Sequence, residues 1–447
     1  MQTNFPPKSL DDPRMAEAER ILRRCVHCGL CTATCSTYVM LGDERDSPRG
    51  RIYLMKDMFE RAAPATPEVQ HHVDRCLSCL SCMTTCPSGV DYMHLVDLAR
   101  AHIEDTGKRP FSERIVRWLL AELIPYPARF RRALALAPLG RLFAPVLKRL
   151  GLKQITAMLD LAPTERIYDP QYDGPGTASS GGATRKRVIL LGGCAQQVLR
   201  PDINDATIRL FARRGVDVEV VAGSGCCGAL VHHMGKEAMA VAQAKANVDA
   251  WTKAIARAPV DAIVVTASGC GTMLKDYGHF LRDHPSHARQ AADIAALAKD
   301  VTEFLSENDL GPPKRWSSLR VAYHSACSMQ HGQRITDLPK TLLRNAGFTV
   351  LDVPEGHICC GSAGVYNILQ PELAGELRRR KVEHIESVRP DIIAAGNLGC
   401  ITQIQHGTPI PVVHTVELLD WACGGPVPRG LERFESAVTD VPEPART

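Results

Sequence analysis

Eight cysteines near the N-terminus occur in two copies of one spacing, Cys-x-x-Cys-x-x-Cys-x-x-x-Cys. They are Cys25, Cys28, Cys31 and Cys35 in the first copy, and Cys76, Cys79, Cys82 and Cys86 in the second. This spacing is typical of proteins that bind two iron-sulfur clusters, because three closely spaced thiolates ligate one cluster and the fourth ligates its neighbour. The two motifs therefore predict electron-transfer chemistry.

Crossed ligation assigns these thiolates to two 4Fe-4S clusters. We expect one cluster to be bound by Cys25, Cys28, Cys31 and Cys86, and the other by Cys76, Cys79, Cys82 and Cys35. Pro87 follows the second motif, whereas Ser36 follows the first. This difference removes a rigid ring from one turn but leaves every thiolate in place.

Zinc and disulfide bonds explain the motifs less well. Structural zinc sites usually combine two separated Cys-x-x-Cys pairs or mixed cysteine and histidine ligands. The chain has 17 cysteines, an odd number, and its first residues form no apolar signal segment, so we expect a reducing, cytoplasmic compartment. Its 447 residues are enough for about three domains, and no apolar run reaches the ~18 residues of a membrane-spanning helix.

The region around the two motifs is expected to be an α-helical ferredoxin domain, residues 1–108. Residues 11–24 have a helical apolar pattern with Asp12 as the cap. The spacer between Cys35 and Cys76 contains 40 residues, including the helix-like RIYLMKDMFERA, which is more than a minimal two-cluster protein needs. A further helix is expected to end at Gly107.

A basic amphipathic helical segment is expected at residues 109–172. Between 109 and 150 it contains nine Lys or Arg and two Glu, a net charge of +7, although the whole chain carries only +4. Interleaved apolar residues suit this segment to an anionic membrane face or a partner subunit. A pair of ordinary domain helices with basic solvated faces is an equal alternative. Nucleic acid is not expected, because no recognition motif accompanies the charge.

A second group of cysteines reveals an internal repeat that follows a predicted flexible linker at residues 173–187. The first copy contains Cys194, Cys226, Cys227 and Cys270, and the second contains Cys327, Cys359, Cys360 and Cys400. Three of these pairs are 133 positions apart and the last is 130 apart. Cys-Cys-Gly occurs in both copies, so we predict duplicated domains at 188–315 and 316–423, followed by a C-terminal tail at 424–447.

Each repeat alternates short apolar runs with helical stretches. VILLGG, VEVVAG and AIVVTAS precede the cysteines of the first copy, and RVAYHSA, TVLDVPEGHI and DIIAAGNLG precede those of the second. This pattern predicts βαβ units with parallel strands. The expected fold class is α/β, with the helical ferredoxin domain followed by a tandem repeat of cysteine-rich domains. The repeat cysteines should meet at the carboxyl ends of the strands.

Three interpretations of the repeat cysteines remain open: a further iron-sulfur centre, a zinc ion or a redox-active thiol pair. Nearby histidines could add ligands, although local hydrogen bonding is their simpler role; they are His232, His233, His324 and His331. Cys423 has no counterpart in the other repeat and is interpreted as a bystander. The chain contains no phosphate loop, dinucleotide fingerprint or hydrolase motif, so no catalytic residue is assigned to it.

The motifs and their order resemble a family that unites the glycolate oxidase iron-sulfur subunit, lactate-utilisation iron-sulfur proteins, and cluster subunits of anaerobic glycerol-3-phosphate dehydrogenase and heterodisulfide reductase. ILRRCVHCGLCTATC, GDERDSPRGRIYLMK, DRCLSCLSCMTTCPSGV, TASGCGTMLKDYG and CCGSAGVYN are most similar to the glycolate oxidase branch. The resemblance extends from about Ile21 to about Leu419 and implies a hetero-oligomer. By this resemblance, FAD-bearing subunits are expected to oxidise glycolate to glyoxylate, or to act on D-lactate. This chain is expected to pass the electrons to membrane quinone at the inner face of the cell membrane.

One departure from the heterodisulfide reductase pattern concerns a fifth cysteine at the end of each repeat. Met273 and Gln403 occupy those places, so each repeat keeps four cysteines and a heterodisulfide-like double cluster is not expected. Two alternatives of other classes remain. One is a stand-alone heterodisulfide- or quinone-reducing enzyme with a catalytic Cys-Cys-Gly site, and the other is a zinc-stapled structural adaptor.

Overall fold

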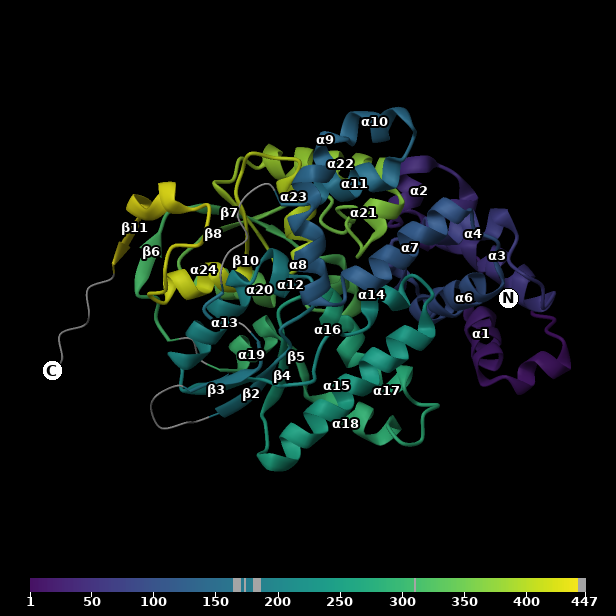
Figure 1. Cartoon of the computed structure of the whole chain (residues 1–447), viewed down its shortest axis with the longest axis horizontal. Coiled ribbons are helices and arrows are strands. Elements are labelled where there is room, and N and C mark those ends of the chain that lie inside the picture. Colours follow the sequence, from purple (N-terminus) through teal and green to yellow (C-terminus); the bar gives the residue numbers. More distant parts are fainter. Residues whose placement is uncertain (164–169, 173, 180–185, 309–310, 441–447) are drawn as a thin grey trace.

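The computed structural model describes residues 1–163, 170–172, 174–179, 186–308 and 311–440 (Figure 1). The N-terminal helices form one end of the molecule, and two α/β domains with separate sheets lie toward the other end. The predicted fold class, a helical domain followed by two cysteine-rich α/β repeats, is confirmed.

The N-terminal domain is built from short helices. They are α1 (Pro13–Arg24), α2 (Ser36–Leu41), α3 (Pro48–Glu60), α4 (Pro67–Asp74), α5 (Ser81–Thr85) and α6 (Tyr92–Thr106). Asp12, Ser47, Thr66 and Asp91 cap four of them by accepting a backbone N–H from the first turn. The apolar faces of α1, α3 and α6 meet in one core, and the helices expected at 11–24 and 51–62 are present as α1 and α3.

The basic segment forms a run of helices that lies over the junction of the domains. They are α7 (Phe111–Leu123), α8 (Pro127–Ala135), α9 (Ala137–Leu142), α10 (Ala144–Arg149) and α11 (Lys153–Leu161). Part of its charge is structural, because Arg109 pairs with Asp74 at 2.6 Å and Arg117 donates to the Met234 carbonyl at 2.6 Å. Among the described residues no helix has the length and apolar composition needed to cross a membrane.

The first repeat contains a five-stranded sheet in the order β1-β3-β2-β4-β5. The strands are β1 (Gly176–Ala178), β2 (Lys186–Leu190), β3 (Val216–Val220), β4 (Ala262–Val265) and β5 (Ala298–Asp300). All pairs are parallel except β1 with β3. The helices are α12 (Gln196–Leu199), α13 (Asp202–Ala212), α14 (Ala229–His232), α15 (Glu237–Arg257), α16 (Ser268–Lys275), α17 (Tyr277–Phe280), α18 (Ala288–Leu297) and α19 (Val301–Glu307).

The second repeat contains a parallel four-stranded sheet in the order β10-β9-β7-β8. The strands are β7 (Arg320–His324), β8 (Thr349–Asp352), β9 (Ile392–Ala395) and β10 (Val412–His414). The helices are α20 (Leu338–Asn345), α21 (Tyr366–Leu369), α22 (Pro371–Ser387), α23 (Leu398–Gln405) and α24 (Thr415–Ala422), with a π-helical turn at Ser328–Gly332.

The two sheets share one topology. The order β3-β2-β4-β5 corresponds to β8-β7-β9-β10, and Val188 pairs with Ala262 as Val321 pairs with Ile392. These register pairs are related by the same sequence offsets as the cysteines. The predicted duplication and the parallel strands are therefore both present in the structure.

Two predicted boundary segments contain regular structure. In the linker predicted at 173–187, β1 and the start of β2 are strands, while residues 173 and 180–185 lie outside the described residues. In the tail predicted at 424–447, β11 (Val438–Asp440) pairs with β6 (Arg315–Ser317), and 441–447 lie outside the described residues. The predicted boundary at 315/316 falls inside β6.

The two repeats share a continuous apolar core and a set of buried ion pairs. Helix α13 packs against α24, and the buried carboxylate of Asp420 accepts from Arg209 at 2.8 Å and from Arg213. Arg200 donates to both oxygens of Glu417 at 2.9 Å. These contacts fix the orientation of the two sheets.

Replacing Asp420 with alanine leaves two partly buried guanidinium groups without their carboxylate, so we expect a loss of about 3 kcal/mol of stability. In a thermal unfolding experiment Tm should fall by roughly 5 °C or more. The control is Glu383→Ala, which removes the partner of exposed Arg379 and should change stability by under about 1 kcal/mol. Equal Tm values for the two variants would contradict this role of Asp420.

Candidate metal centres

The structure gathers the eight N-terminal cysteines around two small cavities. Cys25, Cys28, Cys31 and Cys86 border one cavity, Cys35, Cys76 and Cys79 border the other, and Cys82 borders both. Cys86 thus lies with the first motif and Cys35 with the second, which is the arrangement that crossed ligation requires. The ligand roles themselves stay predictions.

Both cysteine loops share one unusual backbone conformation. His27 and Gly29 have φ angles of 56° and 83°, and Ser78 and Leu80 have φ angles of 47° and 62°. These residues occupy equivalent places, two and four positions after the first cysteine of each motif. Positive φ is unfavourable for residues other than glycine and is usually maintained by a functional constraint. Here it curls each loop around its cavity.

A buried arginine contacts the second group of N-terminal thiols, which is formed by Cys35, Cys76, Cys79 and Cys82. Arg51, on α3, is 1% exposed, and its Nη1 lies 3.9 Å from Cys35 Sγ. It also donates to the His72 carbonyl at 2.6 Å and to Asp46 at 3.1 Å. Burial lowers the pKa of Arg51, but the nearby Cys76, Tyr92 and Cys35 more than offset this and raise it. Arg51 was not among the residues predicted from the sequence, although it belongs to the segment GDERDSPRGRIYLMK.

Hydroxyl groups provide further contacts with the same sulfurs. Tyr92 Oη donates to Cys76 Sγ at 3.8 Å, and Thr37 Oγ1 lies 3.3 Å from Cys35 Sγ. Hydrogen bonds to ligand sulfurs tune the reduction potential of an iron-sulfur cluster. These side chains are therefore placed to tune the reduction potential of a cluster bound by the second group more than that of a cluster bound by the first.

The repeat cysteines lie at the carboxyl ends of the strands, as predicted. In the first repeat, Cys194 follows β2, Cys226 and Cys227 follow β3, and Cys270 is on α16 after β4. The second repeat places its cysteines in the same way, after β7 and β8 and on α23 after β9; they are Cys327, Cys359, Cys360 and Cys400.

Steric constraints explain why each Cys-Cys-Gly motif ends in glycine. Gly228 and Gly361 have φ angles of 93° and 89°, a conformation that favours glycine. A Cβ at Gly361 would lie 2.6 Å from the Ala374 carbonyl, and one at Gly228 would lie 3.1 Å from the Ala240 carbonyl. The cysteine loops can approach α15 and α22 only because no side chain intervenes.

In each repeat the four thiols form a chain of contacts. Hydrogen bonding to Cys226 and burial raise the pKa of Cys194, and the same two causes, with Cys359 as the partner, raise that of Cys327. Burial likewise raises the pKa of Cys79 and Cys82 in the N-terminal groups. Thiolates become stable in such surroundings when a metal supplies positive charge. The donor sets therefore fit metal centres, with four sulfurs converging in each repeat.

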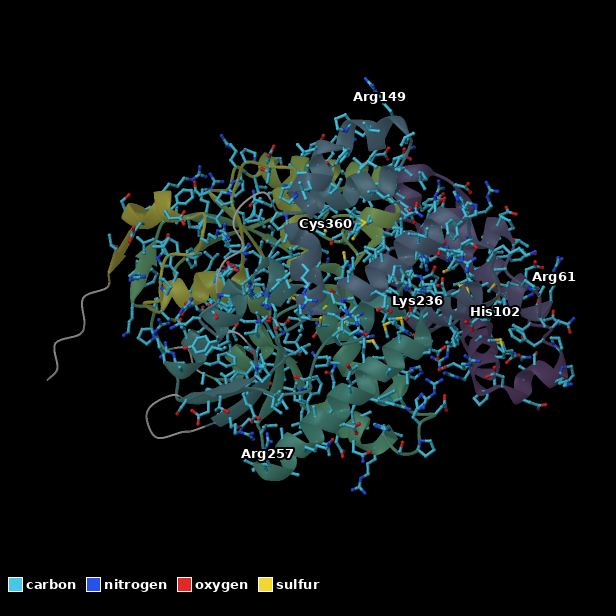
Figure 2. All side chains as sticks on the ribbon, viewed as in Figure 1. Arg61, His102, Arg149, Lys236, Arg257 and Cys360 are labelled. Atoms are coloured by element: carbon cyan, nitrogen blue, oxygen red, sulfur yellow. The ribbon has the colours of Figure 1, made fainter. Side chains whose placement is uncertain are left out.

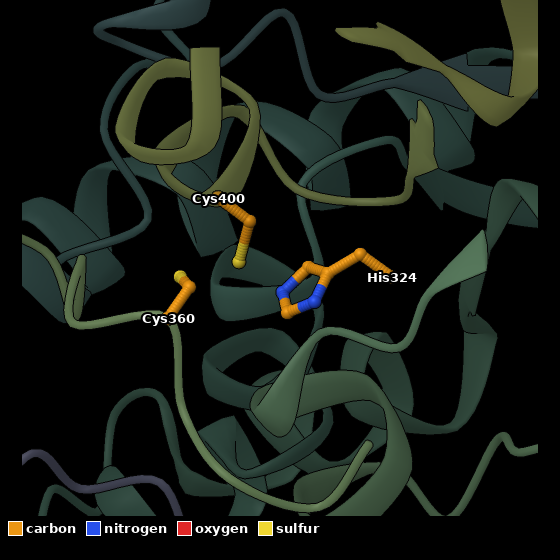
Figure 3. Close-up of side chains that lie close together, drawn as sticks. All are labelled: His324, Cys360 and Cys400. Atoms are coloured by element: carbon orange, nitrogen blue, oxygen red, sulfur yellow. The ribbon is translucent and has the colours of Figure 1, made fainter. Parts of the chain in front are cut away.

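The four histidines named from the sequence have different surroundings. His232 and His233 face Asp97, and His331 Nδ1 lies 2.8 Å from Thr84 Oγ1. His324 instead has a ring nitrogen that lies, with the sulfurs of Cys360 and Cys400, in a group whose atoms are all within 4.8 Å (Figure 3). Burial and Lys381 lower the pKa of His324 to about 3, so its imidazole is neutral.

The last cysteine makes a separate contact. Cys423 is buried at the end of α24, where its sulfur accepts from Arg214 Nη2 at 3.7 Å. Arg213 and Arg214, which directly follow α13, and Asp420 on α24 lie near it, and its interpretation as a bystander stays a prediction.

The N-terminal domain docks onto the second repeat next to the cysteines. Cys359 N–H donates to Ser36 Oγ at 3.0 Å, and Tyr366 Oη donates to the Arg75 carbonyl at 3.1 Å. Leu77, Cys79, Cys327 and Cys359 belong to one apolar cluster. The second N-terminal group and the second repeat group are thus adjacent.

An apolar cavity of about 510 Å³ lies between the two repeat groups. Its walls include cysteines of both repeats together with apolar side chains from α7, α8, α9 and α11. Cys360 is fully buried, whereas Figure 2 shows Arg149 projecting from α10 at the surface. No local sequence pattern predicts this cavity, because its lining comes from four separate regions of the chain.

Fold and cysteine geometry define an iron-sulfur protein with a two-cluster domain and two cysteine-rich domains. A family model described as a 4Fe-4S dicluster domain matches residues 24–90, and one described as a cysteine-rich domain matches 188–275 and 321–405. The "Glycolate oxidase iron-sulfur subunit" of Escherichia coli (strain K12) is 40% identical over 422 residues, 94% of this chain and 99% of that protein.

Two further relatives support the assignment. The "Probable glycolate oxidase iron-sulfur subunit" of Bacillus subtilis (strain 168) is 30% identical over 435 residues, 92% of this chain and 96% of that protein. "Lactate utilization protein A" of Oceanobacillus iheyensis is 27% identical over 244 residues, 52% of this chain and 96% of that protein. The chain belongs to the family of glycolate oxidase iron-sulfur subunits, a family of electron-transfer proteins.

Crossed ligation can be tested with pairs of alanine substitutions. Cys25→Ala combined with Cys86→Ala should remove one cluster, about four irons, because both residues serve the same centre. Cys25→Ala combined with Cys35→Ala should remove two clusters, about eight irons. Iron and sulfide are counted after anaerobic purification, with circular dichroism as the folding control. Loss of about eight irons in the Cys25 and Cys86 variant, with loss of about four in the Cys25 and Cys35 variant, would rule out the crossed assignment.

Proposed function

We propose that this chain is the electron-transfer subunit of a glycolate-oxidising complex. It takes electrons from an FAD-bearing partner that converts glycolate to glyoxylate, or acts on D-lactate, and passes them toward membrane quinone. The observation that carries the proposal is the continuity of the cysteine groups from the surface to the interior. Cys28 is exposed, and Cys82 borders both N-terminal cavities. Cys79 packs against the apolar residues that include Cys327 and Cys359.

The chemistry of each bound 4Fe-4S cluster would be the exchange of a single electron. The chain's own residues would define the path and its energetics. Arg51 provides buried positive charge beside Cys35, and Tyr92 donates a hydrogen bond to Cys76, so both favour added negative charge at the second group. The apolar contacts among Leu77, Cys327 and Cys359 exclude water from the junction.

The surface around the first motif supports docking of the flavin partner there. Val26, Leu30 and Tyr53 are 66%, 55% and 61% exposed, and Val26 and Leu30 flank Cys28 in the loop. Exposed apolar side chains gathered at one place often mark a protein interface. This loop brings a predicted cluster ligand to the surface, where electrons from another subunit can enter.

We expect Val26→Asp with Leu30→Asp to weaken the complex, because two charges would be buried against an apolar partner surface. Electron transfer from glycolate to an artificial acceptor should fall at least tenfold when the partner subunits are limiting, while iron content stays unchanged. Leu338→Asp, at an exposed apolar residue on α20, is the matched control. Unchanged transfer in the double variant would argue against entry at this loop.

The exposed side of α9 and α10 supports peripheral attachment to the inner face of the cell membrane. Leu139, Leu142 and Phe143 are 60%, 74% and 61% exposed, and Lys148 and Arg149 are exposed at the end of α10. An apolar face bordered by basic residues has the chemistry that binds anionic lipid surfaces. Attachment here would bring the apolar cavity between the repeats close to the lipid phase.

Leu142→Ser with Phe143→Ser should lower the affinity for phosphatidylglycerol vesicles at least about tenfold, because two large side chains would no longer enter the interface. Sedimentation with vesicles measures the bound fraction. Tyr53→Ser, at an exposed residue of the N-terminal domain, serves as the control. Equal binding of the wild type to zwitterionic and anionic vesicles would contradict the role of the basic residues.

The cavity favours one second candidate, a stand-alone disulfide- or quinone-reducing enzyme. Its lining includes Cys226, Cys227, Cys359 and Cys360, so a small acceptor inside it could reach both repeat groups. Turnover of a disulfide or quinone by the isolated chain with an artificial donor, abolished by Cys226→Ser or Cys359→Ser, would favour this candidate.

A further inference from the structure

The two repeats differ at three places beside their cysteines. By the cysteine offset of 133 residues, the counterpart of His324 in the first repeat is Leu191. Helix α15 approaches its motif glycine through Ala240, and α22 does so through Ala374. When these two alanines are taken as equivalent, the counterpart of Lys381 is Asn247. Gln403 is opposite Met273 by the offset of 130. The second repeat therefore contains a buried imidazole and a buried ammonium group where the first has uncharged side chains without an imidazole.

His324 is positioned as a donor toward the thiols. It ends β7, three residues before Cys327, and is 1% exposed. Its Nε2 is buried without a hydrogen-bond partner among the described residues. Figure 3 shows the imidazole directed toward Cys360 and Cys400, with which it forms the group within 4.8 Å. A buried unpaired ring nitrogen beside two thiols is unfavourable unless it has a ligand to bind.

Its counterpart Leu191 belongs to the apolar core of the first repeat and offers no donor. The glutamine at the fifth position does not compete for the role, because both its amide nitrogen and its amide oxygen are hydrogen-bonded to other groups. Gln403 Nε2 donates to the Ala374 carbonyl at 3.1 Å, and its Oε1 accepts from Asn367 at 3.1 Å. Among the described residues, His324 is thus the side chain that can add a nitrogen donor to the sulfurs of the second repeat.

Lys381 supplies charge at the same place. Its side chain on α22 is 1% exposed, and its Nζ donates to the Glu355 carbonyl at 2.8 Å. It lies near enough to all four cysteines of the second repeat for its charge to interact with theirs. In the first repeat, Asn247 instead bonds neutral groups, the Gly225 N–H at 2.7 Å and the Cys226 carbonyl at 2.9 Å.

We propose that the second repeat binds a metal centre in which a nitrogen of His324 is a ligand beside the thiolates of Cys360 and Cys400, with Lys381 as the buried counter-charge. The first repeat has no equivalent of either residue. This inference rests on the proposal that the repeats hold metal. Neutral imidazole is a common metal ligand, and replacing thiolate by imidazole raises the potential of an iron-sulfur centre.

The asymmetry has a consequence for electron flow. If both repeat centres contain iron, imidazole ligation and the Lys381 charge both stabilise the reduced form of the second-repeat centre relative to that of the first. A zinc centre would exchange no electron and would leave only the ligation part of the inference. The second repeat is also the one that contacts Cys79. Electrons leaving the N-terminal domain would therefore reach the repeat with the higher potential first.

The test uses the full chain in its complex, purified anaerobically from cells grown with ¹⁵N-histidine. If the centre contains iron, pulsed electron paramagnetic resonance (EPR) should show a directly bound ¹⁵N in a signal distinct from those of the N-terminal clusters. His324→Leu should abolish that coupling, and the control His331→Gln should retain it. His324→Cys should keep the metal, lose the coupling and lower the midpoint potential of this centre, which separates ligation from a purely structural role.

If elemental analysis finds zinc instead, zinc K-edge absorption should show one nitrogen ligand in the wild type and none in His324→Cys. An all-sulfur site, a coupling that survives in His324→Leu, or the absence of metal beyond the N-terminal eight irons would each overturn the inference. The signals of the N-terminal clusters are recorded in the same samples. Their loss would instead show that the electron-relay function itself is wrong.

Discussion

A thiolate buried in an apolar interior requires positive charge nearby, and this constraint organises the structure. Most of the sixteen cysteines in the two motif sets are shielded from solvent, and burial raises the pKa of several thiols well above the usual range. Metal ions are one source of compensating charge. Buried cations are the second source, and the chain places them selectively: Arg51 lies beside Cys35, and Lys381 lies beside the cysteines of the second repeat.

The fold brings the cysteine groups of the N-terminal domain and of the second repeat close together. Short capped helices hold two curled cysteine loops, and parallel strands end in the loops that carry the Cys-Cys-Gly motifs. The N-terminal domain contacts the second repeat through Ser36 and Tyr366 at the place where the cysteines approach one another. The two repeats place their four cysteines in the same way, but they differ beside them at positions such as 191 and 324.

Local patterns predicted much of this structure. The capping residue Asp12, the β-branched runs before the cysteines and the repeat offsets indicated helices, parallel strands and duplicated domains, because each depends on neighbouring residues in the sequence. The grouping of Cys35 with the second motif followed from the chemistry of the spacing. By contrast, Arg51 is expected from its sequence to be an ordinary charged helix residue. Its burial depends on Asp46 and His72, which reach it only after folding.

The same limit explains the other differences. Strand β1 lies in a segment rich in glycine and serine, and its pairing with β3 depends on an edge that the sheet provides. Nothing local distinguishes His324 from His331, since both lie near Cys327. The difference appears only when β7, the Cys-Cys-Gly loop and α23 converge on one point.

The central claim is that the eight N-terminal sulfurs bind two adjoining clusters that transfer electrons. A redox titration of the anaerobically purified chain, followed by low-temperature EPR, tests it most directly. The account predicts a brown protein that yields, on reduction, signals of two 4Fe-4S clusters broadened by their magnetic interaction. A colourless protein without a reducible paramagnetic species would contradict it.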